Sequence, residues 1–264
     1  MIFAPASITC IFSPEISSSA RTSGSIGVGF TIDLGVFVEI DSEVSGVVVN
    51  DREVDFPTVD FVLQRLGLSG VRINSELPFG CGFGLSGASA LATALSVEKP
   101  FMELADLAHE AEVRNLTGLG DVVTQTFGGL VIRKNAACPS KSIVERYKWD
   151  VTLDLLVLDQ ISTKDFLADE LRRNNLKKLG KKWTKEFLIK PTIENLFRCS
   201  NNFAKETGLL EYVEDIIEAV ESEGGSASMV MLGKAVFASG GFKALEEFGN
   251  PFKASMDYCG VRKI

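Results

Sequence analysis

Three features of the sequence predict a two-domain protein of the α+β class. Strand-like alternation of apolar residues concentrates in the first half of the chain, while helical periodicity dominates the second half. Strands and helices in that proportion favour helices packed on one face of a sheet. A length of 264 residues is enough for roughly two domains. A hydrophobic content of 45% supplies ample material for a globular core.

The first strands and the first helix follow from short-range periodicity. Apolar residues alternate over 26–38, and a second apolar run covers 44–49, which together predict a meander of antiparallel strands. Residues 57–66 have the spacing of a helix that begins near a proline and stops at Gly67. Alternation returns over 71–77 and predicts another strand.

Glycines and small residues dominate the next segment. A glycine-rich stretch, 78–87, leads into a helix of small residues over 88–95. A second helix is predicted over 100–114, because its opening proline suits a first helical turn. A short helix should follow Asp121, and a pair of glycines then leads into a strand over 130–134.

A domain boundary is predicted around 136–150, where proline, serines and mixed charges interrupt the pattern. The two domains are therefore expected at residues 1–147 and 148–264. The second domain should hold a strand, a run of long helices, a second strand and a short C-terminal helix, with the first three over residues 153–158, 164–223 and 228–237.

Charge and histidine content exclude several functions. The formal net charge of −8 argues against a nucleic-acid-binding protein, whose binding surface is a basic face. His109 is the only histidine, so a zinc site of the H-E-x-x-H type is excluded. A Ser-His-Asp hydrolase would depend entirely on this one residue.

The cysteines and the hydropathy pattern indicate the compartment. Five cysteines, an odd number without a C-x-x-C pair, favour reduced thiols over disulfides or a zinc site. No apolar run approaches the ~20 residues of a membrane span. The first residues lack the basic region of a signal peptide. We therefore expect a soluble cytoplasmic protein.

One segment is basic in an otherwise acidic chain. Residues 172–190 carry eight lysines and arginines against a single acidic residue, Glu186. The segment is interpreted either as a solvated helix face or as a positive rim that attracts an anionic ligand toward a cleft.

The glycine-rich stretch contains a G-x-G-x-x-G pattern at Gly82, Gly84 and Gly87. A dinucleotide-binding unit would next require a second parallel strand with an acidic residue at its end. Residues 100–114 are predicted to be helical instead, so that unit is missing. Dense glycines and the positive end of the following helix still predict an anion site. The alternative is a tight strand–helix connection without a ligand.

The helix predicted over 100–114 presents a carboxylate on its apolar side. Glu112 shares one helix face with Ala105 and Ala108, and His109 flanks that face. A metal ion would offset the cost of a buried carboxylate. The alternatives are a glutamate that reaches water and a solvated histidine. Asp121, which follows a Gly-Leu-Gly segment, could simply cap a short helix.

The glycine-rich stretch resembles the phosphate loop of the GHMP kinases, whose pattern is P-x-G-x-G-L-G-S-S-A-A. Aligned without gaps, Ser86 falls on the family's Mg²⁺-binding serine, whereas Leu85 replaces a serine and Gly87 an alanine. The resemblance implies that backbone N–H groups of this stretch bind the phosphates of ATP. The residues so implied are Pro78, Gly80, Cys81, Gly82, Phe83, Gly84, Leu85, Ser86, Gly87 and Ala88.

The same resemblance implies roles for two carboxylates. Asp121 lies seven residues before a Gly-Gly pair, as the catalytic aspartate of the GHMP kinases does. Glu112 occupies the place of the family's Mg²⁺-binding glutamate. Mg²⁺ would therefore be held by Ser86 and Glu112, with Asp121 as the catalytic residue.

Within the GHMP kinases, the chain is similar to the archaeal pantoate kinases. The motifs that carry this similarity are Pro5-Ala6-x-Ile8-Thr9, Ser23-Gly24-Ser25-x-Gly27-x-Gly29, Ala108-His109-Glu110-Ala111-Glu112-Val113, Thr117-Gly118-Leu119-Gly120-Asp121-Val122-Val123-x-Gln125 and Ser228-Met229-x-Met231-Leu232-Gly233-x-x-x-Phe237-Ala238. Ser7 replaces a lysine of mevalonate-type kinases, and residues 228–238 lack their glycine-rich third motif. Both departures weaken a mevalonate or galactose assignment.

The similarity implies that Ser25, His109 and Arg133 contact pantoate, with Arg133 paired to its carboxylate. From the residues alone, Ser25 could be a turn residue and Arg133 an exposed charge at a strand end. The implied reaction transfers the γ-phosphoryl group of ATP to the terminal hydroxyl of pantoate, giving 4-phosphopantoate for coenzyme A synthesis.

The implied architecture is the two-domain GHMP kinase fold, with an N-terminal domain of the ribosomal protein S5 type and a smaller α+β C-terminal domain, in a homodimer. Two other functions stay open. One is a GHMP-type kinase for another small alcohol, such as homoserine, mevalonate or a sugar. The other is a non-catalytic nucleotide-binding regulator.

Overall fold

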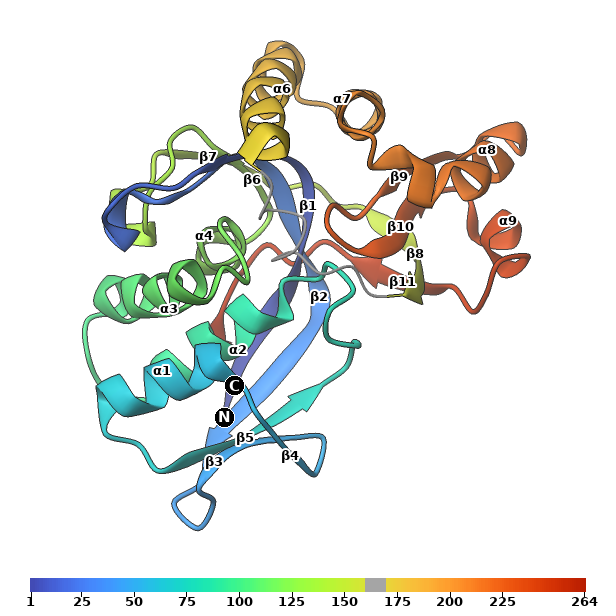
Figure 1. The fold of residues 1–264 in the computed structure, drawn as a ribbon. Helices are drawn as coiled ribbons and strands as arrows, with labels where there is room; N and C mark the ends of the chain where they lie inside the picture. The colour runs from blue at the N-terminus through green and yellow to red at the C-terminus, as the bar shows by residue number, and fades with distance from the viewer. Residues whose placement is uncertain (160–169) are drawn as a thin grey trace.

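The computed structural model describes residues 1–159 and 170–264 (Figure 1). The predicted α+β class is confirmed: helices cover two sheets. The part of the predicted helical region over 164–169 lies outside the described residues. In the part of the chain that the structure describes, no helix has the length and apolar character needed to cross a bilayer.

The first sheet is built on a long antiparallel hairpin of β1 and β2. Its main path runs β12-β1-β2-β5-β3-β4, and β6 pairs with both β2 and β7. β3 is parallel to β5, and the other pairs are antiparallel. The strands are β1 Ile2–Glu15, β2 Gly24–Ile40, β3 Gly46–Val49, β4 Arg52–Val54, β5 Gly70–Ser75, β6 Leu130–Arg133, β7 Val144–Tyr147 and β12 Arg262–Lys263.

β1 has no counterpart among the predicted strands. Nearly all of its residues are buried, so the strand shows no alternation of apolar and polar positions. Its register with β2 shifts between Pro5 and Ser7 and again between Thr9 and Ile11.

Four helices cover the first sheet where the sequence predicts them (Figure 1). α2 and α4 pack on β1 and β2, and α1 and α3 pack against α2. The helices are α1 Pro57–Leu66, α2 Leu85–Ala94, α3 Phe101–Asn115 and α4 Asp121–Phe127. α2 begins before residue 88, where the sequence predicts its start, so Ser86 lies in the first turn of the helix.

The second sheet has the order β11-β8-β10-β9 and lies to the right in Figure 1. Its strands are β8 Thr152–Asp159, β9 Ser226–Met229, β10 Lys234–Ser239 and β11 Phe252–Ser255. The prediction of a single strand over 228–237 is wrong, because an antiparallel hairpin forms there. The apolar run continues through the turn, where Leu232 adopts a positive φ of 63°, so periodicity alone does not reveal it.

Between β8 and β9 the structure describes α6 Glu170–Ile189, α7 Ile193–Thr207 and α8 Glu214–Ser222, and α9 Phe242–Glu246 follows β10. Three short 3-10 helices are η1 Ala20–Thr22, η2 Pro139–Lys141 and η3 Leu210–Tyr212. The basic segment forms α6, which packs on β1. Lys177 and Lys181 of α6 form ion pairs with Glu15 of β1, and Lys182 pairs with Glu206 of α7.

One apolar core joins the two sheets. The Phe30 ring of β2 meets the Phe237 ring of β10 edge-on at 5.5 Å, and Phe237 stacks on Phe197 of α7 at 5.2 Å. The chain also returns to the first sheet at its end, where β12 pairs with β1. The division into domains 1–147 and 148–264 stays a prediction, and the last strand joins the sheet of the first domain.

Candidate active site

The glycine-rich loop after β5 closes over the N-terminus of α2. Gly80, Gly82 and Gly84 have positive φ angles of 82°, 88° and 60°, a region that favours glycine. Gly84 is the N-cap of α2, and the first helical hydrogen bond runs from Ala88 N to Gly84 O at 3.0 Å. The earlier N–H groups of the helix are therefore available to an anion, as the sequence predicts.

A cavity of about 690 Å³ lies in front of this loop. Its walls come from the loop, the start of α1, the segment that joins α3 to α4, and the turn between β9 and β10. The lining residues are Thr9, Phe12, Ser25, Phe56, Pro57, Thr58, Phe79, Gly80, Gly82, Phe83, Gly84, Leu85, Ser86, Asn115, Leu116, Thr117, Gly118, Leu119, Gly120, Asp121, Met231 and Leu232.

The β9–β10 turn packs directly on the glycine-rich loop. A Cβ atom added to Gly82 would lie 2.8 Å from the Cα of Gly233 and 2.9 Å from a methyl of Val230. Only glycine permits this close approach. The turn is tied to β1 as well, because Met231 N donates to Thr9 O at 3.0 Å. The two sheets therefore meet at the cavity, which is where a concave ligand site is favoured.

Ser86 and Glu112 lie side by side at the cavity floor. Ser86 Oγ donates to Glu112 Oε1 at 2.5 Å, and Thr117 Oγ1 donates to the same oxygen at 2.7 Å. Glu112 is 1% exposed, and its Oε2 has no hydrogen-bond partner among the described residues. Burial raises the pKa of Glu112 to about 7, although the hydrogen bonds from Ser86 and Thr117 lower it. The alternative of a glutamate that reaches water is excluded.

Asp121 is the first residue inside α4, because Gly120 occupies the N-cap position. Its Oδ1 accepts a hydrogen bond of 2.9 Å from Ser7 Oγ of β1. Burial raises the pKa of Asp121, while the Ser7 hydrogen bond and the Arg133 charge lower it. Asp121 is thus a carboxylate at the cavity wall held by a distant strand, rather than a helix cap.

Glu112 and Asp121 approach each other at Gly118. A Cβ atom added to Gly118 would clash with Glu112 Oε2 and would lie 2.7 Å from Asp121 Oδ2. A buried carboxylate oxygen without a partner, next to a second carboxylate and the Ser86 hydroxyl, forms an all-oxygen set of ligands. Mg²⁺ prefers such ligands, so these residues fit a magnesium ion.

Arg133 is buried behind the cavity wall and is 1% exposed, so the alternative of a surface charge is excluded. Its Nε donates to Ser25 O at 3.2 Å and its Nη1 donates to Thr124 Oγ1 at 2.6 Å. Nη2 has no hydrogen-bond partner within the described ranges. Burial lowers the pKa of Arg133 to about 10, against the opposing effect of Asp121. The guanidinium lies beneath Gly120, where an added Cβ would be 2.7 Å from its Cζ.

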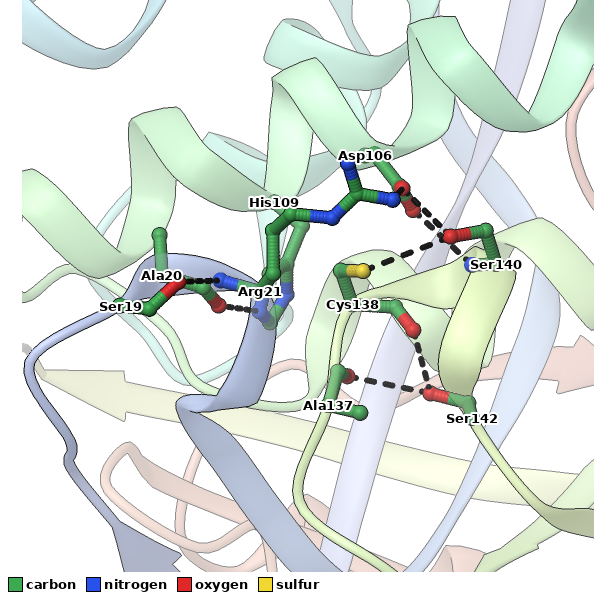
Figure 2. A network of polar contacts seen from close by, with 9 residues as sticks. All are labelled: Ser19, Ala20, Arg21, Asp106, His109, Ala137, Cys138, Ser140 and Ser142. Atoms are coloured by element: carbon green, nitrogen blue, oxygen red, sulfur yellow. Dashed lines mark hydrogen bonds and ion pairs between the residues drawn. The ribbon is translucent and has the colours of Figure 1, made fainter.

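His109 faces away from the cavity lining, toward the segment before β2 (Figure 2). The carbonyl oxygens of Ala20 and Ser23 accept hydrogen bonds from its Nε2 at 3.2 and 2.9 Å. The ring is 1% exposed, so it is not a solvated histidine, and burial lowers its pKa. His109 thus holds η1, and Ser23 lies two residues before the cavity residue Ser25.

The predicted site residues therefore fall into two sets. Ser25, Ser86, Asp121 and the loop residues Gly80, Gly82, Phe83, Gly84 and Leu85 line the cavity. Glu112 contacts Ser86 from beneath, and Arg133 contacts Ser25 in the same way. Pro78, Cys81, Gly87, Ala88 and His109 lie outside the lining. The lining holds no residue of α6 within the described range 170–189, and three lysines of the basic segment form the ion pairs with Glu15 and Glu206 given above.

Several polar residues of the site carry no assigned role in the sequence analysis. Thr58 Oγ1 lies 3.3 Å from Ser86 Oγ, whose proton is donated to Glu112, and Thr117 donates to the same Glu112 oxygen as Ser86. Ser7 and Gln125 meet beside Asp121. Ser7, Thr117 and Gln125 stand within the motifs quoted above, but motif positions alone give no partner for a hydroxyl or an amide. Thr58 has no local signal beyond its place at the start of a helix.

Comparison with known proteins gives one consistent result. Residues 56–129 match the family model described as the GHMP kinases N terminal domain. A pantoate kinase of Methanocaldococcus jannaschii is 32% identical over 259 residues, which cover 93% of this chain and 94% of that protein. A pantoate kinase of Thermococcus kodakarensis is 31% identical over 258 residues, 89% of this chain and 86% of that one.

Solved structures agree with the sequence matches. A protein described as a phosphotransferase related to the CoA biosynthesis pathway has a TM-score of 0.82 at 26% identity, with 99% of this chain and 98% of the other covered. A mevalonate kinase of Methanococcus jannaschii has a TM-score of 0.65 at 15% identity, covering 97% of this chain and 98% of that one. The second likeness concerns the fold alone.

Proposed function

Because this chain belongs to the pantoate kinase family within the GHMP kinases, we propose that it phosphorylates pantoate with ATP. The product is 4-phosphopantoate, an intermediate in coenzyme A synthesis. The observation that carries the proposal is that Ser86 and Asp121 line one cavity beside the N-terminus of α2, while Glu112 bonds to Ser86 from beneath and approaches Asp121 at Gly118. An anion site, a pair of carboxylates and a buried arginine are the parts that phosphoryl transfer to an anionic alcohol needs.

The triphosphate of ATP binds at the glycine-rich loop. The free N–H groups at the start of α2 point to the cavity, and their partial positive charge favours phosphate oxygens. Ser86 lies in this first turn, so its hydroxyl and the helix N–H groups act on the same phosphates. Phosphoryl transfer depends on such positioning more than on covalent chemistry by the protein.

Glu112 and Ser86 would hold Mg²⁺ when the nucleotide is bound. Such an ion would supply positive charge to neutralise the phosphates. The support for this assignment is the Oε2 of Glu112, which has no hydrogen-bond partner among the described residues, and its approach to Asp121 Oδ2 at Gly118. The Ser86 hydroxyl donates a hydrogen bond to Glu112 Oε1, which lowers the cost of burying that carboxylate.

Asp121 orients the terminal hydroxyl of pantoate and accepts its proton. Its Oδ1 is already bound to Ser7, so Oδ2, which faces Gly118, is the oxygen available for the acceptor. A pKa raised by burial makes this carboxylate a better proton acceptor than an exposed aspartate.

Ser25 contacts pantoate from the cavity wall, and Arg133 attracts the carboxylate of pantoate from behind that wall. The unpartnered Nη2 supports this role, because a buried guanidinium is stable only with anionic or hydrogen-bonding partners. His109 supports the same region by holding the backbone at Ala20 and Ser23. The histidine thus acts on pantoate binding through η1.

The family also supports a homodimer, which light scattering of the purified protein would test. The five cysteines, all of which are free thiols, support a protein that functions in the reducing cytoplasm.

The proposal is tested by ADP release with a panel of acceptors under Mg²⁺ and ATP. Pantoate should give the highest kcat/KM, with homoserine, mevalonate and galactose near background. A preference for one of the others would replace pantoate as the substrate. No ADP release with any acceptor of the panel would favour the non-catalytic regulator.

A further inference from the structure

Ser7 makes three hydrogen bonds that join separate parts of the site. Its backbone N–H donates to Phe83 O of the glycine-rich loop at 2.9 Å. Its hydroxyl donates to Asp121 Oδ1 at 2.9 Å and accepts from Gln125 Nε2 at 3.2 Å. Ser7 is fully buried in the middle of β1, near the register shift at Pro5. One small side chain therefore contacts the loop, the proposed catalytic carboxylate and a helix amide.

Gln125 completes this connection from α4. It lies four residues after Asp121, so both side chains project from the same face of the helix. Its amide Nε2 donates to Gly84 O at 2.8 Å as well as to Ser7. Gly84 is the N-cap of α2, so the amide connects the phosphate-binding helix to the partner of Asp121. Gln125 is 0% exposed, which makes both bonds costly to lose.

The direction of the hydrogen bonds follows from the chemistry of the groups. A serine hydroxyl has one proton to donate. Because the amide N–H of Gln125 donates to the Ser7 oxygen, the Ser7 proton is free to point at Asp121 Oδ1. This bond favours the ionised form of Asp121 and fixes the plane of its carboxylate. Oδ2 is then left for the acceptor hydroxyl at the cavity wall.

We propose that Ser7 and Gln125 are positioning residues that fix the Asp121 carboxylate relative to the N-terminus of α2. The acceptor hydroxyl at Asp121 and the phosphate at α2 then meet at a fixed distance and angle. The role rests on the proposed function, because Asp121 must be the residue that handles the acceptor hydroxyl. Ser7 stands where mevalonate-type kinases carry a lysine. In this chain a neutral hydroxyl oriented by an amide therefore supports the aspartate.

The test is a double-mutant cycle between Ser7→Ala and Asp121→Asn, measured as kcat for ADP release under saturating ATP and acceptor. Ser7→Ala alone should lower kcat about 10- to 100-fold, with KM for ATP and pantoate changed less than about threefold. In the Asp121→Asn background, Ser7→Ala should cause little further loss, because residues that act as a unit are not additive.

Three further variants separate positioning from a general structural effect. Ser13→Ala is the matched control, because Ser13 is buried on the same strand but donates to Lys177 O, away from Asp121. It should leave kcat within about twofold of the wild type. Ser7→Thr keeps the hydroxyl and should restore most of the lost kcat. Gln125→Met keeps the side-chain length without the amide, and should lower kcat without adding to Ser7→Ala.

Two outcomes would overturn the proposal. One is a Ser7→Ala variant with wild-type kcat. The other is an equal fold-loss from Ser7→Ala in the wild-type and Asp121→Asn backgrounds, which means that Ser7 acts independently of Asp121. Failure of the proposed function would look different, because the wild type itself would then prefer another acceptor. The same cycle can be run with whichever acceptor the wild type uses.

Discussion

Glu112 and Asp121 each place one carboxylate oxygen close to the position that a Cβ atom of residue 118 would occupy. The Oδ2 of Asp121 would lie 2.7 Å from a Cβ at that position, and the Oε2 of Glu112 would overlap it. Burial raises the pKa of both groups, and the charge of Asp121 raises that of Glu112 further. Two buried carboxylates facing one open point are stable together when a proton or a cation lies near them.

Gly118→Ala should place a methyl group in the space proposed for Mg²⁺. Gly118 has no positive φ, so alanine fits the backbone and the damage should come from the methyl alone. We expect at least a tenfold loss of Mg²⁺ affinity, read by the Mg²⁺ dependence of kcat. Gly249→Ala is the control, because its methyl would meet only the tip of Leu156. Unchanged Mg²⁺ dependence in Gly118→Ala would contradict the site.

Glu112→Gln should stabilise the metal-free protein while it removes activity. The raised pKa of about 7 means that the folded state holds a proton that the unfolded state releases. Stability from this group is therefore present at low pH and is lost as pH rises toward 7 and above. At pH 8 the variant should be more stable by about 1–3 kcal/mol, and at pH 4 the difference should vanish.

The measurement for Glu112 is thermal or urea unfolding with a chelator present. Glu110→Gln is the matched control on the same helix, because Glu110 is partly exposed and pairs with Arg65 and Arg114. It should not gain stability at pH 8. A Glu112→Gln variant that is less stable than the wild type at pH 8 would show that burial of the ionised carboxylate does not destabilise the metal-free protein.

His109 should make the protein sensitive to mild acid. Burial lowers its folded pKa below the ordinary value of 6.5, although its two hydrogen bonds and the charge of Asp106 oppose the shift. The unfolded chain then binds a proton that the folded chain does not, so stability is full above pH 6.5 and falls as pH drops below it. The Tm of His109→Gln should decline less between pH 7 and pH 5. Parallel curves for variant and wild type would argue against a buried neutral ring.

Arg133→Lys should affect the KM for pantoate much more than the KM for ATP. Lysine keeps a positive charge, but its single ammonium nitrogen cannot reproduce the planar guanidinium that reaches Ser25 O and Thr124 Oγ1 from two different nitrogens. KM for pantoate should rise at least tenfold, while KM for ATP should stay within about threefold. Equal increases for both substrates would mean that Arg133 supports the whole cavity instead of the carboxylate.

Local sequence signals predicted most helices and many strands. The start and end of α1 and the start of α3 follow from Pro57, Gly67 and Pro100, which act within a few residues. β1 was not predicted because both of its faces are buried. Apolar and polar residues alternate only in strands that have one solvent-exposed face. The β9–β10 turn was not predicted because Leu232 and Gly233 form it within an apolar run, and no polar residue marks the turn.

The site divides along the same line. Spacing predicts Glu112 on the buried face of α3 and Asp121 at the start of α4, and the resemblance of the loop indicates Ser86. Ser7 lies 114 positions before its partner Asp121, so only the folded chain reveals their contact. His109 shows the opposite limit. Its helix register is correct, yet its ring bonds to the backbone at Ala20 and Ser23 instead of lining the cavity.

The most direct test of pantoate phosphorylation through Asp121 compares the wild type with Asp121→Asn. Mass spectrometry measures the phosphorylated pantoate that each forms under equal ATP, Mg²⁺ and pantoate. The wild type should convert pantoate to a single monophosphate with one ADP released for each. Asp121→Asn should bind ATP with near-normal affinity and form the product at least 1,000-fold more slowly. An Asp121→Asn variant with near-normal product formation, or a wild type that leaves pantoate unmodified, would contradict the account.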